Sequence, residues 1–263
     1  MATTDAEAAR AHVAELDWWH TIEVAPGVVT PGGWDLRPTA ERLPWPPSLA
    51  GMRCLDIGTM DGFWAFELER RGAGEVIASD VLDATRLDHF TADRLRGQQH
   101  RRPSERNFAL AAELRGSRIE LRDLNIYELD PDEIGEFDLL VMGYVLQMLR
   151  DPLRGLEAVR RVCRGQLILL DTVSRPLELL PAPLARLDAR RDGSEWFVFN
   201  RRGLRKALEL AGWVVEETTS VLRDHAGPGV GPRERALTLP MHTFGIRGRS
   251  AAIRARPLDE SPR

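Results

Sequence analysis

The sequence predicts an α/β fold of the doubly wound class, in which helices flank a mostly parallel sheet. From residue 50 onward, short apolar runs typical of buried strands alternate with segments of helical periodicity. The first of these strands ends in a glycine-containing turn that leads directly into a helix, and sheets of this class bind ligands at such turns. The 263 residues, 43% of them apolar, suffice to bury a large core within one domain.

Each element is placed by its apolar pattern and its flanking turn residues. The predicted strands are residues 53–58, 75–80, 118–124, 137–142, 166–173, 213–221 and 250–257. The predicted helices are residues 1–16, 63–73, 84–96, 107–114, 151–163 and 200–213. The last two strands are expected to form an antiparallel hairpin. The result is a Rossmann-like, seven-stranded sheet that is parallel except for one strand.

Three regions lie outside this alternation. Residues 1–49 are expected to form an N-terminal helix and an aromatic cap, because the segment 17–35 is rich in Gly and Pro yet carries three tryptophans that need a surface to pack on. Residues 50–257 form the main domain, and 258–263 a tail. Within the domain, the Pro-rich insertion 174–200 after the fifth strand is expected to act as a lid or substrate loop.

Composition narrows the class of protein and its compartment. No apolar run approaches the about 20 residues that span a bilayer, and the polar, acidic start of the chain is unlike a signal peptide. Two cysteines, Cys54 and Cys163, cannot build a disulfide scaffold, so we expect a soluble, cytoplasmic protein with no membrane partner. The net charge of −4 argues against DNA as the partner. Lys206 is the single lysine among 36 basic residues, which indicates either codon bias or selection for arginine forks.

The turn after the first strand reads Asp56-Ile57-Gly58-Thr59-Met60-Asp61-Gly62. It lacks the full GxGxxG pattern of dinucleotide-binding folds, because Met60 stands at the middle glycine. Asp80 ends the second strand, 22 residues after Gly58, where a carboxylate can accept hydrogen bonds from ribose hydroxyls. Its alternative role is to cap the helix that follows.

These two segments, LDIGTMDGFWAFELERRGAGEVIASD, resemble motifs I and II of class I S-adenosylmethionine-dependent methyltransferases. The stretch WWHTI at 18–22 and the segment GYVLQMLRDPL at 143–153 resemble the family of bacterial tRNA carboxymethoxyuridine methyltransferases. The resemblance extends from about residue 16 to residue 222, which is most of the chain.

The resemblance implies S-adenosylmethionine as cofactor and S-adenosylhomocysteine as its product. The cofactor-binding positions it implies are Asp56, Gly58, Thr59, Met60, Asp61, Gly62, Asp80, Val81, Asn125, Ile126 and Gly143. In this reading, residues 58–62 line the methionine portion, Asp80 holds the ribose, Val81 lies against the adenine, and Asn125 with Ile126 contacts its edge. Asn125 has an alternative reading as a turn residue that accepts a hydrogen bond from its own backbone.

The chain departs from the carboxymethyl-transferring relatives at two places. Those relatives need a cationic side chain ahead of the core, supplied by a lysine, but Asp17 and Trp18 stand about there and no lysine precedes Lys206. Gln147 and Met148 stand where the family has Tyr and His. Both departures favour ordinary methyl transfer over carboxymethyl transfer.

Three side chains are candidates for a catalytic base: His20, Tyr144 and His242. The candidate substrate contacts are Trp19, Trp34, Trp196 and Asn200. The aromatic residues would suit a flat or apolar acceptor, or would simply attach the cap to the core, and Asn200 could equally cap the helix that begins there. The scattered histidines show no metal-ligand spacing, so we expect no metal.

The favoured function is therefore methylation of a small-molecule acceptor, in secondary metabolism or natural product biosynthesis. One alternative is a tRNA wobble-uridine-modifying methyltransferase, for which a group of arginines would form the phosphate-binding patch. These arginines are Arg94, Arg96, Arg101, Arg102 and Arg106. A further alternative is a non-catalytic nucleotide-binding module or an NAD-dependent oxidoreductase.

Overall fold

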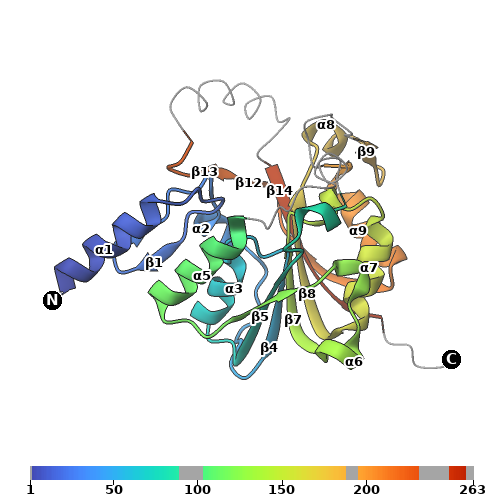
Figure 1. Cartoon of the computed structure of the whole chain (residues 1–263). Coiled ribbons are helices and arrows are strands. Elements are labelled where there is room, and N and C mark those ends of the chain that lie inside the picture. The colour runs from blue at the N-terminus through green and yellow to red at the C-terminus, as the bar shows by residue number, and fades with distance from the viewer. Residues whose placement is uncertain (1, 89–102, 188–194, 231–248, 259–263) are drawn as a thin grey trace.

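The computed structural model describes residues 2–88, 103–187, 195–230 and 249–258. Its centre is a sheet in the order β6-β5-β4-β7-β8-β14-β11, with the two-residue β12 (Leu222–Arg223) paired to β14 (Figure 1). The main strands are β4 (Arg53–Ile57), β5 (Glu75–Asp80), β6 (Glu120–Asp123), β7 (Phe137–Gly143), β8 (Cys163–Thr172), β11 (Trp213–Thr218) and β14 (Arg249–Pro257). In this path β14 runs in the opposite direction to the other six strands, which are parallel to one another. The predicted fold class is thereby confirmed.

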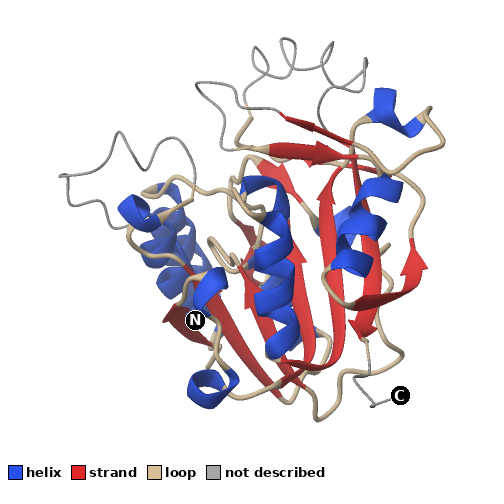
Figure 2. Ribbon diagram, turned by 90° about the vertical axis from the view of Figure 1, so that its right-hand side faces the viewer, coloured by secondary structure: helices blue, strands red, loops and turns tan. Residues whose placement is uncertain are grey.

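Helices cover both faces of the sheet (Figure 2). They are α1 (Ala2–Ala14), α2 (Arg37–Ala40), α3 (Phe63–Arg70), α5 (Pro103–Arg115), α6 (Pro131–Ile134), α7 (Pro152–Arg161), α8 (Arg175–Glu178) and α9 (Arg201–Leu210). Three 3₁₀ turns follow strand ends: η1 (Ala84–Arg86), η2 (Ile126–Glu128) and η3 (Leu146–Met148). None of the helices in these described ranges is long and apolar enough to cross a membrane.

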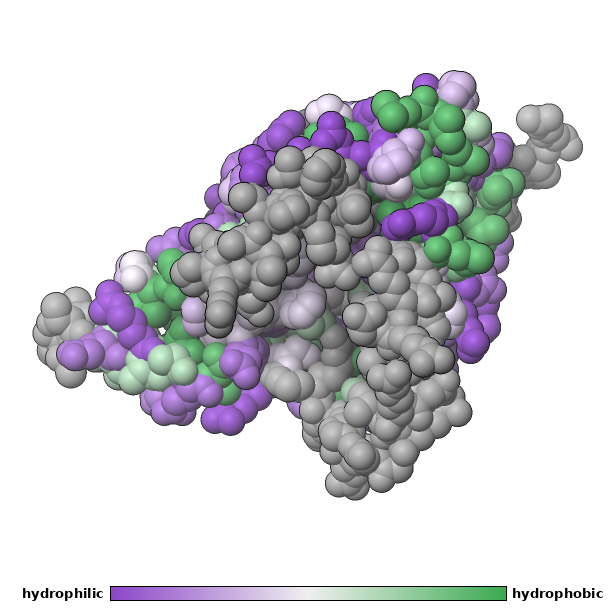
Figure 3. Space-filling view, turned by 90° about the horizontal axis from the view of Figure 1, so that it is seen from above, coloured by the Kyte–Doolittle hydropathy of each residue, from purple (hydrophilic) through white to green (hydrophobic). Residues whose placement is uncertain are grey.

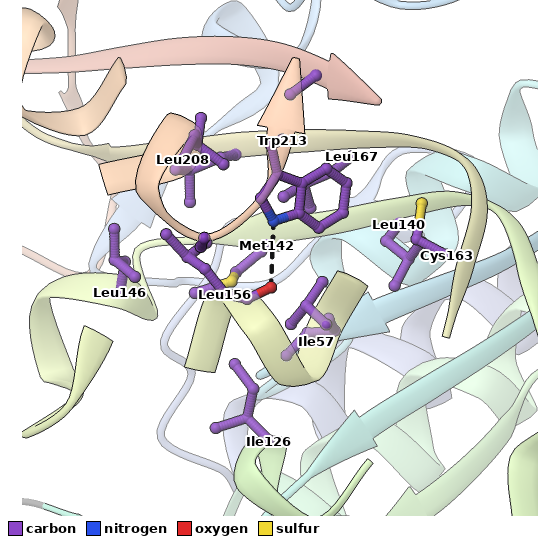
Figure 4. Packing of buried hydrophobic residues seen from close by; sticks show 14 of the residues in the cluster. Ile57, Ile126, Leu140, Met142, Leu146, Leu156, Cys163, Leu167, Leu208 and Trp213 are labelled. Carbon is purple, nitrogen blue, oxygen red and sulfur yellow. Dashed lines mark hydrogen bonds between the residues drawn. The ribbon is translucent and has the colours of Figure 1, made fainter. Parts of the chain in front are cut away.

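The core on one face lies between the sheet and helices α7 and α9 (Figure 4). The helix predicted at 151–163 forms α7, where Leu153 is 38% exposed but Leu156 and Val159 are fully buried in this core. Trp213 at the start of β11 packs beside them, and its indole Nε1 donates a hydrogen bond of 3.1 Å to the carbonyl oxygen of Leu156. Buried apolar side chains of α7, α9 and the sheet thus pack into one core.

The core on the other face joins α3 and α5 to the N-terminal segment. Phe66 of α3 stacks on Phe108 of α5 with ring centroids 5.3 Å apart. Val13 of α1 and Trp18 pack into the same cluster, and the Trp18 indole donates to the carbonyl oxygen of Val13 at 2.9 Å. The aromatic residues of the cap therefore do have a surface to pack on.

The cap contains short strands that the sequence did not indicate. A hairpin joins β1 (Glu23–Ala25) and β2 (Val28–Val29). A second pair joins β3 (Trp34–Asp35) to β13 (His225–Ala226), which comes from near the other end of the chain. These strands are two or three residues long, too short for a recognisable alternation.

Two more segments differ from their predictions. Of the helix predicted at 84–96, the described part contains only the 3₁₀ turn η1, while residues 89–102 lie outside the described ranges. The insertion 174–200 is more regular than expected, since β9 (Ala185–Leu187) and β10 (Phe197–Phe199) form an antiparallel pair. Seen from above, hydrophobic residues gather at the end of the molecule where α8 and β9 lie (Figure 3), and the exposed Leu179 and Leu187 belong to this insertion.

Candidate functional site

The turn between β4 and α3 is built around Asp56, which is fully buried. Its Oδ2 accepts hydrogen bonds from Thr59 Oγ1 at 2.6 Å and from the backbone N–H of Ala65 at 2.9 Å. One carboxylate oxygen therefore ties the strand, the turn and the first turn of the helix together. Burial raises the pKa of Asp56 to about 7.

Backbone conformation at Gly58 explains why a glycine closes this strand. Its φ of +74° lies in the left-handed region, and a Cβ placed there would lie 2.4 Å from Cγ2 of Val145. Met60, two residues on, also has a positive φ of 52°, which is uncommon outside glycine. The missing middle glycine of the motif is thus replaced by a methionine that adopts a glycine-like conformation.

Asp80 reaches this turn from the end of β5. Its side chain is 5% exposed, and Oδ2 accepts a hydrogen bond from the Met60 backbone N–H at 2.8 Å while Oδ1 accepts one from Val81 at the same distance. The alternative role as a helix cap is wrong, because the N-cap of η1 is Asp83, which accepts from the N–H of Thr85. The sequence-predicted pair of glycine turn and acid is therefore in direct contact.

The remaining predicted cofactor positions end the neighbouring strands. Asn125 caps η2, because its Oδ1 accepts a hydrogen bond from the Tyr127 backbone N–H at 3.1 Å, and Ile126 is buried in the core below. The turn reading of Asn125 is thereby confirmed for its oxygen. At the end of β7, Gly143 packs against Trp64, whose indole Nε1 would lie 2.4 Å from a Cβ at this position.

Asp61 holds the cap against the turn. Its Oδ2 accepts hydrogen bonds from the backbone N–H groups of Trp19 at 2.7 Å and His20 at 3.0 Å, and its Oδ1 lies 3.4 Å from Nδ1 of His20. Burial alone would raise the pKa of Asp61, but the hydrogen bonds from His20 and Trp19 outweigh it and lower the pKa. The sequence did not indicate this role, because the partners are more than 40 residues apart.

Three backbone segments form one layer above this contact. His20 forms a parallel bridge with Trp34, and Trp34 in turn pairs with Ala226 of β13. The segments approach so closely that a Cβ on Gly32 would lie 2.0 Å from the carbonyl carbon of His20. The predicted residues His20 and Trp34 are thus brought together, whereas Trp19 is 52% exposed.

Tyr144 connects the end of β7 to this layer. It has a φ of 60°, and its hydroxyl donates a hydrogen bond of 2.8 Å to Oδ1 of Asp224, the residue just before β13. Ser250 Oγ donates to the same oxygen at 2.6 Å. Burial and the nearby carboxylate raise the pKa of Tyr144 well above its usual value. Asp224 and Ser250 were not indicated by the sequence.

The buried Asp171 at the end of β8 is a further group that the sequence did not single out. Its carboxylate accepts hydrogen bonds from the backbone N–H groups of Gln147 at 3.1 Å and Thr172 at 2.7 Å. Burial raises the pKa of Asp171 to about 8. The side-chain Oε1 of Gln147 is buried without a hydrogen-bond partner among the described residues.

Trp196 and Asn200, predicted to contact the substrate, instead form hydrogen bonds that join separate segments of the chain. Trp196 donates from its backbone N–H to the carbonyl oxygen of Gln147 and from its indole Nε1 to that of Asp88, both at 2.7 Å. Asn200 is fully buried and caps α9 through Gly203, and its side chain also bonds to Leu177, Ala182 and Leu184. The helix-cap reading of Asn200 is confirmed, and we do not carry this residue into the substrate site.

Other candidates cannot be placed. His242 and the arginines at 94, 96, 101 and 102 lie outside the described residues, whereas Arg106 lies on α5. Within the part of the chain that the structure describes, no group of three or more His, Cys, Asp or Glu side chains is arranged to hold a metal ion.

Comparison with known families decides the identity of this fold. Residues 35–218 match the sequence model of a family described as a methyltransferase domain. The chain belongs to this methyltransferase family. Its sheet order and glycine turn are those of the class I S-adenosylmethionine-dependent methyltransferases, whereas the narrower resemblance to tRNA carboxymethoxyuridine enzymes is not confirmed.

Solved structures share the fold of this methyltransferase at low sequence identity. The N-terminal domain of EvdMO1, solved with S-adenosylhomocysteine, is 17% identical with a TM-score of 0.55, and the match covers 95% of each chain. The 1,6-didemethyltoxoflavin-N1-methyltransferase of Burkholderia thailandensis, solved with bound 1,6-didemethyltoxoflavin and S-adenosylhomocysteine, is 16% identical with a TM-score of 0.52, over 85% of this chain and 78% of that one.

A third structure with a similar fold is described as a cyclase and not as a methyltransferase. The 4+2 cyclase SpnF is 17% identical with a TM-score of 0.57, over 84% of this methyltransferase and 79% of the cyclase. No curated protein is significantly similar in sequence. The fold therefore does not by itself fix the acceptor, which has to be argued from the site.

Proposed function

We propose that this chain transfers a methyl group from S-adenosylmethionine to a small-molecule acceptor, in secondary metabolism. The observation that carries the proposal is the contact between the glycine turn after β4 and the buried carboxylate of Asp80 at the end of β5. Parallel sheets of this kind bind nucleotides at the carboxyl ends of their strands, and a carboxylate at the second strand suits ribose hydroxyls.

The residues present fit the cofactor. The carboxylate of Asp80 lies at the end of β5 against the turn, where it accepts hydrogen bonds from the backbone N–H groups of Met60 and Val81. Residues 58–62 would border the methionine portion of the cofactor. A side chain at Gly58 would clash with Val145, and one at Gly62 would clash with Phe66 and Phe108, so the turn requires glycine at both positions. Val81 and Ile126 would border the adenine, with the amide of Asn125 at its edge. When bound, the cofactor supplies a methyl group on a positively charged sulfur.

The cap supports a small acceptor. Asp61, in the cofactor turn, bonds directly to Trp19 and His20, so the cap is attached next to the turn rather than at a distance from it. A cap attached at this turn would exclude water from the site, which favours displacement at a sulfonium methyl group. The toxoflavin-type methyltransferase with a similar fold is described with a small heterocyclic compound, which agrees with this proposal.

The chain's contribution to the reaction is alignment. Methyl transfer needs the acceptor atom, the methyl carbon and the sulfur in line, and holding two reactants in that geometry accounts for much of the rate. His20 lies next to the cofactor turn, because its backbone N–H donates to Asp61 and its Nδ1 lies 3.4 Å from the other oxygen of that carboxylate.

Calorimetry with S-adenosylhomocysteine tests the proposal. Replacing Asp80 with alanine deletes the carboxylate, and we expect weaker binding by about 1–3 kcal/mol, since hydrogen bonds to charged groups have this value. Glu75→Ala is the matched control, because Glu75 begins the same strand at the opposite edge of the sheet and is half exposed. Failure of the wild-type protein to bind S-adenosylmethionine or S-adenosylhomocysteine would refute the proposal, and salt-sensitive binding of tRNA would count against a small acceptor.

A further inference from the structure

A polar cluster joins three distant parts of the chain at the carboxyl end of β7. Tyr144 follows β7, Asp224 follows β12, and Ser250 lies in β14. Asp224 Oδ1 receives the Tyr144 hydroxyl at 2.8 Å and the Ser250 hydroxyl at 2.6 Å, and the two hydroxyl oxygens are 3.3 Å apart. Ser250 is fully buried, whereas Tyr144 is only partly buried.

The backbone at Tyr144 is held in an unfavourable conformation to make this contact. A φ of 60° is an outlier for a bulky aromatic residue and persists only where the surrounding structure holds it. Gly143 packs against Trp64 on one side, and the Tyr144 N–H donates to the carbonyl oxygen of Leu170 at 2.7 Å on the other. The surrounding packing therefore fixes where the phenol lies.

The direction of the hydrogen bonds decides what the phenol can offer a ligand. Its single proton is directed to Asp224, so the lone pairs of its oxygen are the part that remains for another molecule. A group with this polarity recognises a hydrogen-bond donor. Asp224 in turn has no proton of its own to give while it is ionised.

We propose that Tyr144 accepts a hydrogen bond from the O–H or N–H group of the methyl acceptor, and that Asp224 is the positioning residue that takes the phenol's proton. This inference rests on the proposed function. When the acceptor's O–H or N–H bond breaks, its proton moves to Oη of Tyr144 while the phenol's proton moves to Oδ1 of Asp224. The electron pair left on the acceptor atom forms the bond to the methyl carbon, and the pair of the broken carbon–sulfur bond remains on sulfur. After the product leaves, Asp224 releases the proton to solvent.

The charges around Asp224 suit this role. Burial raises the pKa of Asp224, which makes it a stronger proton acceptor than an exposed carboxylate. The hydrogen bonds from Ser250 and Tyr144 act in the opposite direction and lower this pKa in part. His225 and Arg249 also act on Asp224, and both favour its ionised form. The carboxylate of Asp171 on β8 raises the pKa of Tyr144 and so opposes ionisation of the phenol.

A spectroscopic titration tests the pairing without any acceptor. The chain has two tyrosines, so Tyr127→Phe leaves Tyr144 as the only source of tyrosinate absorbance. We expect Tyr144 to ionise well above the usual range, and Asp224→Asn in the same background to lower its pKa by at least one unit, because the neighbouring negative charge is gone. Asp35→Asn is the control, since this cap carboxylate bonds to Arg37 and should leave the titration unchanged. An ordinary pKa that Asp224→Asn does not move would overturn the inference.

Turnover with chemically paired acceptors tests the step itself. A panel of phenols, anilines and N–H heterocycles is compared with the same compounds already methylated, with release of S-adenosylhomocysteine as the readout. We expect only the donor-bearing compounds to react, and the acid limb of the wild-type pH–rate profile to disappear in Asp224→Asn, with at least a tenfold loss of kcat in Tyr144→Phe. Unchanged profiles and rates in both variants would contradict the proposal.

These variants also separate this inference from the proposed function. Both should bind S-adenosylhomocysteine as tightly as the wild-type protein, because neither residue belongs to the proposed cofactor contacts. Loss of cofactor binding in the wild type would refute the proposed function, whereas normal binding together with unchanged tyrosine titration and turnover would refute only the role of Asp224.

Discussion

Replacing Asp61 with alanine should release the cap from the cofactor turn. The carboxylate is 1% exposed and accepts the N–H groups of Trp19 and His20 through short hydrogen bonds. A buried N–H group left without a partner costs about 1–3 kcal/mol. The variant leaves two such groups, and if water reaches one of them, the free energy of unfolding should fall by about 3 kcal/mol. For a chain of this length, that loss corresponds to a fall in Tm of roughly 6–12 °C.

Urea unfolding followed by tryptophan fluorescence measures this effect, because three tryptophans lie in the cap segment. Asp61→Asn should cost about half as much, since an amide oxygen can still accept both N–H groups but without charge. Asp35→Ala is the control, because its bonds to Arg37 lie at the surface and should contribute less than about 1 kcal/mol. A loss of stability at Asp61→Ala no larger than at Asp35→Ala would refute the account of how the cap is held.

Three further changes have defined outcomes. Gly58→Ala should lower the free energy of unfolding, measured with urea, and the affinity for S-adenosylhomocysteine, measured by calorimetry. Adding Val145→Ala should restore only part of each loss, because it removes the clash with Val145 but not the strain of a φ of +74°. The pKa of Asp56 is raised from 3.8 to about 7, so its contribution to stability is complete below pH 3.8 and is lost as the pH rises through 7. Asp56→Asn should therefore flatten the fall in the free energy of unfolding between these pH values, and an unchanged slope would show that Asp56 is not the cause of that fall. Trp213→Phe should cost about 1 kcal/mol of stability, because it removes the hydrogen bond from the buried indole to the Leu156 carbonyl, while cofactor affinity should not change.

The sequence was sufficient for those parts of the site that depend on local pattern. The strand, the glycine turn and the acid ending the next strand are marked by apolar runs and a fixed spacing, and the structure brings Met60 of the turn into contact with Asp80. The cap role of Asn200 was also open from the sequence, because an N-cap and its helix are adjacent in the chain.

The contacts that join the cap to the sheet could not be predicted in the same way. Asp61 bonds to residues more than 40 positions away, and Tyr144 reaches Asp224 and Ser250 across 80 and 106 positions. No periodicity relates such residues, since tertiary packing alone brings them together. The positive φ of Tyr144 is likewise set by the neighbours of β7 and not by any preference of tyrosine.

A crystal structure of the protein with bound S-adenosylhomocysteine tests the central claim most directly. The account predicts the nucleoside at the carboxyl ends of β4 and β5, with the ribose hydroxyls within hydrogen-bond distance of the Asp80 carboxylate and the sulfur on the side of Gly143. A nucleoside bound elsewhere on the chain, or at these strand ends with Asp80 turned away from the ribose, would contradict it.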